Sequence, residues 1–511
     1  FRSLALLAMS RAHDRLPWLL LFVLAAVPVQ AQTGPDVPEM ASYDAYFLDF
    51  LDRYAIPGAS VAVSRSGRLV YARGFGLADV DAALAVQPTD RFRVASVSKP
   101  ITAVVAMKLV EDGRLDLDAP AFAVLDDLPP PDGQTDDPRL AQITVRDLLQ
   151  HSGGWDRDGT VYDPMFDVVN IAAAMGVPAP ADVETVIRFM RGRPLDFDPG
   201  SRYAYSNFGV AVLGRVLERV TGTPYDQLVK ETLAPTGITS FEIGGSRLAD
   251  RLPGEVRYYS PFAEVPSVFG DGPVPWPYGG FHIEAMDAHG GWVASAPDLL
   301  RFTTALDGLT NRPDVLAAET RAAMVARPDL ATWNGSSSWY GLGWSSNTNG
   351  HWWHLGSLPG AESLLVRSSY NGLHWAVLLN TRTNATSTYM AELDQAMWTL
   401  ALGITTWPTH DLFDTVVADE GQPDAATLSL DAYPNPTFAS ATVAVTLPAA
   451  ANVRAEVVDL LGRRVATLHD GPLAAGTHRL TLDAARLPTG VYVVRTVTPD
   501  ATLTQRLTVA H

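Results

Sequence analysis

Cysteine, lysine and net positive charge are all scarce in this sequence. Cysteine is absent from the 511 residues, which excludes disulfide bonds, thiolate metal sites and cysteine nucleophiles. Lysine occurs only as Lys99, Lys108 and Lys230. The net charge of −18 argues against nucleic acid as a partner and against electrostatic docking on anionic membranes.

Two widespread hydrolase signatures are missing as well. No G-x-S-x-G nucleophile elbow occurs, which disfavours an α/β-hydrolase. No H-E-x-x-H motif occurs, and His351 with His354 is too isolated a pair to indicate a metal site. We therefore expect neither a metal ion nor another cofactor.

Long apolar runs are rare too, and the clearest one lies near the beginning. Two arginines precede an apolar run over residues 16–27, and the small-residue pattern Val29-Gln30-Ala31 follows it. This order predicts a cleaved signal peptide over residues 1–31. The run is short for a spanning helix, so a membrane anchor is the less favoured alternative and no transmembrane segment is expected in the mature chain.

The hydrophobic pattern predicts strands at both ends of the first 400 residues and helices between them. Alternation over residues 58–76 and 363–381 predicts two hairpins, which turn at Ser66-Gly67 and Asn371-Gly372. Helical periodicity is found over residues 40–53, 98–111, 145–150, 181–191, 208–220, 225–233 and 389–402. We therefore expect an α+β fold in which early and late strands enclose a helical middle.

Residues 251–288 are rich in aromatic residues, proline and glycine and show no clear period. This composition predicts a long loop region over a site. Its aromatic residues could line the substrate pocket, although packing within the loop is the favoured interpretation. The residues concerned are Tyr258, Tyr259, Trp276 and Tyr278.

A candidate nucleophile stands at the start of the second predicted helix. Ser96-Val97-Ser98-Lys99 is an S-x-x-K sequence, and side chains three residues apart share one face of a helix. A serine hydroxyl needs a nearby base, and burial near a helix N-terminus disfavours the charged form of Lys99. The alternative is a surface serine and lysine on an ordinary helix, but Lys99 lies in an otherwise apolar segment.

Two further motifs carry candidate site residues. In Tyr205-Ser206-Asn207, Tyr205 could relay a proton if Lys99 lowers its pKa, and Asn207 could bind a substrate amide; the alternative is a helix cap beside a packed tyrosine. In His354-Leu355-Gly356-Ser357, His354 could supply a cation or a hydrogen-bond donor, and Gly356 could allow close approach of a substrate. The alternative for His354 is a strand histidine among tryptophans.

These three motifs, in this order, resemble the serine β-lactamase and penicillin-binding-protein group, and within it the class C, S12-type branch. Segments 145–154, 233–238 and 289–299 extend the similarity, which covers roughly residues 40–405. The resemblance implies a β-lactamase/transpeptidase-like fold, with an antiparallel sheet flanked by helices and an all-helical lobe.

The resemblance also implies roles for the residues. Ser96 would be acylated, Lys99 and Tyr205 would share acid–base duty, and Asn207 would orient the substrate. The amides of Ser96 and Ser357 would hold the oxyanion, and water would then hydrolyse the acyl-enzyme.

One departure from the group's pattern bears on the substrate. Where β-lactamases have K-T-G, this chain has His354 and Leu355 before the glycine, so the lysine and threonine that grip a substrate carboxylate are missing. Ester, amide or peptide hydrolysis is therefore favoured over a β-lactamase or D-Ala-D-Ala carboxypeptidase. The alternative of another class is a non-catalytic surface protein that binds a ligand, against which the intact Ser96, Lys99 and Tyr205 argue.

The composition changes near residue 406. Residues 406–427 are polar and acidic, as in a linker, and short alternating strands from residue 428 predict a small all-β sandwich. The motifs Tyr433-Pro434-Asn435-Pro436 and Thr489-Gly490-Val491-Tyr492 resemble the C-terminal sorting domain of type IX secretion over residues 428–511. That resemblance implies a secreted or cell-surface protein that engages the secretion machinery; a generic β-sandwich binding module is the alternative.

Overall fold

The computed structural model describes most of the chain after the expected signal peptide, which lies outside the described residues. The described ranges are 32–416, 429–433, 437, 440–447, 450–459, 463–474, 476–499 and 502–509. The chain divides into two compact units, with the boundary after Val416. Within the described ranges, none of the helices has both the length and the apolar character needed to cross a bilayer.

The first unit is built on an antiparallel sheet that joins the two predicted hairpins. Strand β14 (Leu373–Leu379) of the late hairpin pairs with β2 (Gly58–Arg65) of the early one, so segments 300 residues apart form one sheet. The path is β1-β3-β2-β14-β13-β12-β11-β10, with β4 beside β3. The other bounds are β1 Gln32–Thr33, β3 Arg68–Asp79, β4 Leu84–Ala85, β10 Ser338–Tyr340, β11 Ser345–Asn347, β12 Trp352–Leu358 and β13 Ala361–Arg367.

Both hairpin turns are where the sequence predicts them. Ser66 and Gly67 have φ angles of 52° and 73°, and Asn371 and Gly372 have φ angles of 51° and 58°. Positive φ at both central residues is the requirement of a type I′ turn, whose twist matches that of the flanking strands. At the early hairpin this turn fits the pairing of Arg65 with Arg68. In the late hairpin the last strand pair is Arg367 with His374, so Asn371 and Gly372 lie within a longer loop.

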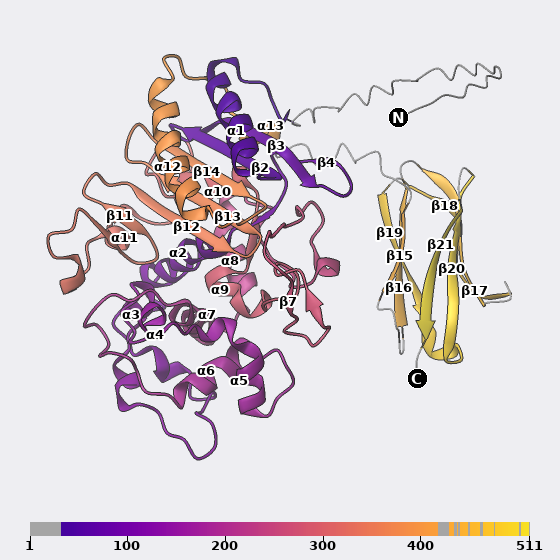
Figure 1. The fold of residues 1–511 in the computed structure, drawn as a ribbon, viewed down its shortest axis with the longest axis horizontal. Coiled ribbons are helices and arrows are strands. Elements are labelled where there is room, and N and C mark those ends of the chain that lie inside the picture. Colours follow the sequence, from indigo (N-terminus) through magenta and orange to yellow (C-terminus); the bar gives the residue numbers. More distant parts are fainter. Residues whose placement is uncertain are drawn as a thin grey trace, which may run out of the picture. The chain divides into compact units, whose positions relative to one another are not determined.

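Helices cover both faces of this sheet, as the alternation of its strands requires. Val61 and Val63 of β2 pack with Phe47 of α1 (Ala41–Tyr54) and Leu393 of α12 (Thr386–Gly403). Ala62, between them in the sequence, belongs to the core on the opposite face, which α2 (Ser98–Glu111) and α10 (Ala296–Thr304) cover. Figure 1 shows α2 between the sheet and the helical lobe.

The helical lobe contains the four helices predicted between residues 145 and 233, and two that the sequence pattern did not predict, at Arg157–Thr160 and Val168–Met175. Helix α7 begins at Asn207, one residue before the predicted start, because the Oγ of Ser206 accepts a hydrogen bond from the amide of Gly209 and caps it. The lobe and its neighbours comprise α3 Val145–Leu149, α4 Arg157–Thr160, α5 Val168–Met175, α6 Val183–Arg191, α7 Asn207–Thr221, α8 Tyr225–Leu233, α9 Asp287–Gly290 and α11 Ala318–Val325, with short strands β5 Phe92–Arg93, β6 Glu242–Ile243 and β9 Trp292–Ala294.

The aromatic loop region packs mainly on itself and on the core. It contains only one short hairpin, of β7 (Val265–Pro266) and β8 (Pro273–Val274). Tyr258 and Tyr278 are buried, and the hydroxyl of Tyr278 accepts a hydrogen bond of 2.8 Å from the amide of Tyr258. These contacts agree with the favoured interpretation of loop packing.

The beginning of the expected linker belongs to the first unit. Residues 406–427 read as a linker because they are polar, yet Leu412 and Phe413 are buried in the core of the first unit. Asp411 forms an ion pair of 2.7 Å with Arg312, and short helix α13 runs from Phe413 to Val416. The burial of these two apolar side chains therefore anchors the polar segment to the first unit. Residues 417–427 lie outside the described residues.

The second unit is an all-β sandwich. One sheet has the order β15-β16-β19 and the other β18-β17-β20-β21, and Val443, Val457, Val494 and Leu507 from both sheets share one core. The bounds are β15 Ser429–Tyr433, β16 Ser440–Leu447, β17 Ala451–Asp459, β18 Arg464–Leu473, β19 Gly476–Asp483, β20 Gly490–Val497 and β21 Thr502–Val509. Of the sorting-domain motifs, residues 434–436 lie outside the described residues.

We predict that Phe413→Ala destabilises the first unit by about 3 kcal/mol or more, because removing a buried aromatic ring leaves a cavity. All 12 tryptophans lie at or before Trp407, so tryptophan fluorescence during urea unfolding follows the first unit alone. The exposed neighbour Asp414 is the control: Asp414→Ala should change the unfolding free energy by less than about 0.5 kcal/mol. Equal effects of the two substitutions would contradict the packing described for Phe413.

Candidate active site

The candidate nucleophile lies on a tight turn that leads into α2. Ser96 belongs to a 3₁₀ turn, Ala95–Val97, which continues directly into the helix. Ala95 has φ of 48°, a left-handed conformation that costs a non-glycine residue of the order of 1–3 kcal/mol and is common at functional sites. The surrounding core holds this strained turn, since Ala95 is buried.

Gly356 is the reason that β12 can lie against this turn. A Cβ atom at Gly356 would lie 2.2 Å from the carbonyl oxygen of Val94 and 3.1 Å from the Cβ of Ala95. The Oγ of Ser363, opposite Gly356 on β13, donates to the same Val94 carbonyl at 2.7 Å. The glycine therefore allows the approach of the protein's own backbone, whereas the sequence suggested the approach of a substrate.

Lys99 is buried beneath Ser96 and bonded on three sides. Its Nζ lies 3.0 Å from the Oγ of Ser96, 2.8 Å from the Oδ1 of Asn207 and 2.8 Å from the carbonyl oxygen of His289. Burial, and then the charge of Arg157, hold the pKa of Lys99 well below its usual value. A neutral amine donates two protons to Asn207 and His289 and directs its lone pair at Ser96, so this geometry suits a base.

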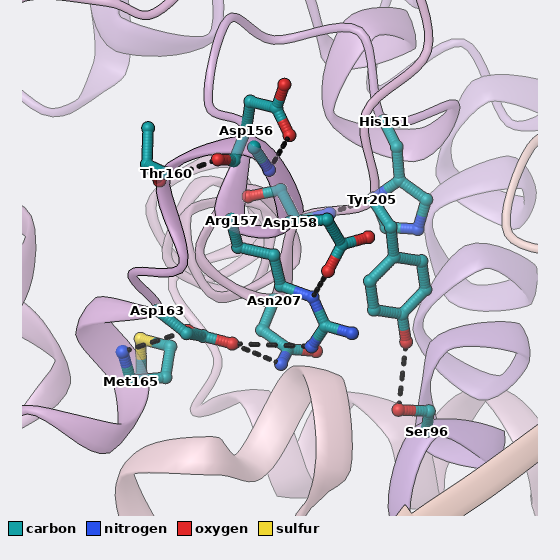
Figure 2. A network of polar contacts seen from close by, with 12 residues as sticks. Ser96, His151, Asp156, Arg157, Asp158, Thr160, Asp163, Met165, Tyr205 and Asn207 are labelled. Atoms are coloured by element: carbon teal, nitrogen blue, oxygen red, sulfur yellow. Dashed lines mark hydrogen bonds and ion pairs between the residues drawn. The ribbon is translucent and has the colours of Figure 1, made fainter.

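Tyr205 contacts the same serine oxygen from the helical lobe. Its hydroxyl donates to the Oγ of Ser96 at 2.9 Å, and Figure 2 shows this contact beside the polar network. Burial raises the pKa of the Tyr205 phenol above its usual value, although the hydrogen bond with Ser96 and the charge of Arg157 oppose the rise. The expectation of a lowered tyrosine pKa is therefore wrong, and the phenol is a proton donor at rest.

A chain of polar groups behind the serine holds Lys99 and Tyr205 in place. The Nδ2 of Asn207 donates to Asp163 at 2.7 Å, and Asp163 forms an ion pair with Arg157 at 3.5 Å, as drawn in Figure 2. The guanidinium of Arg157 lies 4.6 Å from the ring centre of Tyr205. Sequence reasoning missed Asp163 and Arg157, because no local pattern distinguishes them from surface charges.

His151 supports the ring of Tyr205 from the side. The two ring centres are 4.5 Å apart, and the ring of Tyr340 lies 4.6 Å from His151 and 6.5 Å from Tyr205, so the three rings form one cluster. Burial lowers the pKa of His151 well below its usual value, so the imidazole is a neutral packing group. The segment 145–154, quoted for its family resemblance, contained this residue without assigning it a role.

His354 is neutral and already bonded within the protein. Its Nδ1 lies 2.7 Å from the carbonyl oxygen of Leu355, and its Nε2 lies 3.1 Å from the hydroxyl of Tyr340. Burial, and then the charge of Lys99, lower the pKa of His354 to about 3. The suggestion that His354 supplies a cation is therefore wrong.

A cavity of about 940 Å³ opens above these groups. It is lined by Ser96, Tyr205, Asn207, His354 and Ser357, while Lys99 lies below its floor and the four aromatic residues of the loop region do not line it. Its wall carries charges of both signs, from Arg157 and Arg382 and from Asp158, Asp163 and Asp167. The structure thus brings together residues that are up to 261 positions apart in the sequence, and leaves room for a substrate beside the serine.

Comparison with known proteins identifies the first unit. The profile of the family described as Beta-lactamase matches residues 43–396. The chain belongs to the Beta-lactamase family. Members of this family with this fold are serine hydrolases, which include esterases and amidases. The β-lactamase/transpeptidase-like fold expected from the motifs is confirmed.

Individual relatives of this Beta-lactamase family member differ in how much of it they match. Esterase EstB of Burkholderia gladioli is 34% identical over 202 residues, which are 39% of this chain and 50% of that protein. Protein Rv1367c of Mycobacterium tuberculosis is 29% identical over 316 residues, 58% of this chain and 75% of that protein. The chain thus spans about half the length of EstB.

Solved structures resemble the fold at low sequence identity. The octameric penicillin-binding protein homologue from Pyrococcus abyssi has a TM-score of 0.54 at 20% identity, covering 92% of this chain and 96% of that one. The D-amino acid amidase from Ochrobactrum anthropi SV3 has a TM-score of 0.53 at 24% identity, covering 68% and 92%. At these identities the likeness shows the fold alone.

The second unit matches a family of its own. The profile described as Secretion system C-terminal sorting domain covers residues 431–510. The type IX sorting domain expected from the sequence is thereby confirmed, and it marks the protein as secreted or cell-surface.

We predict that Lys99→Met lowers the acylation rate of Ser96 by at least about 100-fold, because general-base catalysis typically contributes that much or more. Lys108 is the matched control: it lies on the same helix, forms an exposed ion pair of 2.6 Å with Asp112, and Lys108→Met should leave the rate unchanged. Stopped-flow acylation with an activated ester measures both. If Lys99→Met changes the acylation rate only slightly, Lys99 does not act as the base.

Removing the charge of Arg157 and removing that of Asp163 should shift the pH dependence of the acylation rate in opposite directions. The positive charge of Arg157 lowers the pKa of Lys99 and the negative charge of Asp163 raises it. A base works when deprotonated, so the acylation rate rises with pH through the pKa of Lys99. We predict that Arg157→Gln shifts this rise to higher pH and Asp163→Asn shifts it to lower pH, measured as pre-steady-state rates. Shifts of the same sign would contradict Lys99 as the titrating group.

Proposed function

We propose that this protein is a secreted serine hydrolase that cleaves ester or amide bonds through an acyl-enzyme on Ser96. The observation that carries the proposal is the convergence on one hydroxyl: the amine of Lys99 at 3.0 Å and the phenol of Tyr205 at 2.9 Å. A serine with an adjacent base, itself oriented by a third group, is the arrangement of an activated nucleophile. Here the third group is Asn207, bonded to Lys99 at 2.8 Å.

The proposed reaction moves one proton from the serine to the leaving group. Lys99 accepts the proton as the Oγ of Ser96 attacks the substrate carbonyl, and the backbone amides of Ser96 and Ser357 hold the oxyanion. Tyr205, a phenol at rest, donates a proton to the departing alcohol or amine and recovers one from Lys99. Water then attacks the acyl-enzyme by the reverse route, releases the acid and restores Ser96.

The substrate preference rests on what the third motif lacks. His354 carries no charge and is bonded to Tyr340, so it does not replace the lysine that grips a carboxylate. The similarity to a protein named as an esterase supports an ester substrate. A β-lactamase or D-Ala-D-Ala carboxypeptidase remains the second candidate, because Arg382 on the cavity wall offers a cation for a substrate carboxylate.

The free-energy cost of burying Lys99 argues against the alternative of a ligand-binding protein without catalysis. Burying a lysine side chain is expensive unless its polar head is bonded or neutral. A binding protein has no use for an amine of lowered pKa against a serine oxygen, whereas a hydrolase needs one.

We predict that a fluorophosphonate probe labels the protein and that Ser96→Ala abolishes the labelling. Ser98→Ala is the control, because Ser98 lies in the same motif but its Oγ accepts a hydrogen bond from the amide of Trp292, 3.3 Å away. p-Nitrophenyl acetate, a D-amino acid amide and nitrocefin, assayed side by side, separate the substrate classes, and we expect kcat/KM to be highest for the ester. Equal labelling of the wild type and Ser96→Ala would end the enzyme hypothesis.

A further inference from the structure

A second cavity lies on the other face of the strand that borders the catalytic pocket. It has a volume of about 770 Å³, within the usual range of small-molecule sites. Strands β12 and β13 form one wall and helix α12 forms the other. We call it the α12 groove; its lining includes Trp353, Leu355, Leu364, Val366, Met390, Ala391 and Trp398.

The α12 groove and the catalytic pocket meet at the edge of β12, where they share lining residues. Trp353, Leu355 and Ser357 line both cavities. Strand β11 pairs only with Trp352 and Trp353 of β12, so the edge of β12 beyond Trp353 has no strand beside it there. Leu355 lies on this open edge with 47% of its surface exposed, so the edge between the two cavities presents an apolar surface.

The most deeply buried carboxyl of the α12 groove presents little charge to a ligand. Glu362 is almost fully buried and accepts a hydrogen bond of 2.8 Å from the Oγ of Ser357. Burial raises the pKa of Glu362 to about 8, so this carboxyl is mostly protonated at neutral pH. Burial also lowers the pKa of His351 and raises that of Asp394, and Asp394 is exposed on α12 at the rim of the groove lining.

We propose that the α12 groove holds the apolar chain of a substrate whose scissile carbonyl lies at Ser96. This rests on the proposed hydrolase function and deepens it, since it names esters or amides with a long alkyl chain as the substrate class. The shared edge supplies the route, and the walls of Leu364, Val366 and Met390 supply the apolar surface. Each CH₂ group that enters should raise kcat/KM by roughly fourfold.

The first experiment compares chain lengths on the full protein. p-Nitrophenyl esters from acetate to decanoate lengthen the acyl side, and acetates of ethanol to decanol lengthen the alcohol side. We expect kcat/KM to rise with length in one series, which identifies the part of the substrate that enters the groove. No rise in either series overturns the proposal.

The second experiment fills the α12 groove. Ala391 is exposed on α12 and lines the groove, so Ala391→Trp should lower kcat/KM for the long-chain ester at least tenfold and leave acetate unchanged. Thr399 is the matched control, because it is exposed on the same helix and lies outside the groove lining. Thr399→Trp should leave kcat/KM unchanged for both the long-chain ester and the acetate. An unaltered length profile in Ala391→Trp overturns the proposal.

A binding measurement separates this inference from the proposed function. Calorimetry of decanamide with Ser96→Ala, and with Ser96→Ala combined with Ala391→Trp, needs no catalysis. We expect binding to the former and at least tenfold weaker binding to the latter; equal affinities or no binding to the former overturn the groove assignment. Acetate hydrolysis that persists in Ser96→Ala would instead overturn the proposed function alone.

Discussion

The catalytic arrangement depends on one buried amine. Lys99 is 1% exposed, and a buried ammonium without compensation would be very unfavourable. The protein meets this constraint with three oxygen partners and with a pKa held well below the usual value. Because two of these partners come from α7 and α9, any displacement of the helical lobe against α2 would leave the amine unsatisfied. The packing of the helical lobe against α2 therefore also maintains the hydrogen bonds of Lys99.

The network behind the serine balances opposite charges on that amine. Arg157 disfavours the charged form of Lys99 while Asp163 favours it, and the two form an ion pair with each other. Arg157 also lies over the ring of Tyr205, so one guanidinium affects both groups that contact Ser96. Arg157 of α4 and Asp163 in the following turn thus act on the groups around Ser96, although neither touches its hydroxyl.

The sheet determines how the pocket is bordered. Pairing of β2 with β14 joins the ends of the first unit and brings β12 beside the turn of Ser96, where only a glycine at position 356 fits. Because β11 pairs with only the first residues of β12, the rest of that edge borders the catalytic pocket on one face and the α12 groove on the other. The short length of β11 thus leaves part of β12 open to both cavities.

The sequence by itself determined the features that are local. Turn chemistry at Asn371-Gly372, helical periods and the three-residue spacing of Ser96 and Lys99 predicted hairpins, helices and the nucleophile, because each depends on neighbours along the chain. Tertiary structure decided the charge states and hydrogen-bond partners of the site residues, and it decided that Phe413 belongs to the core. Burial raises the pKa of Tyr205 and neutralises His354, and burial is a property of the packed molecule. Arg157 and Asp163 gain their roles only through folding, since no pattern in the chain connects them to a serine more than 60 residues away.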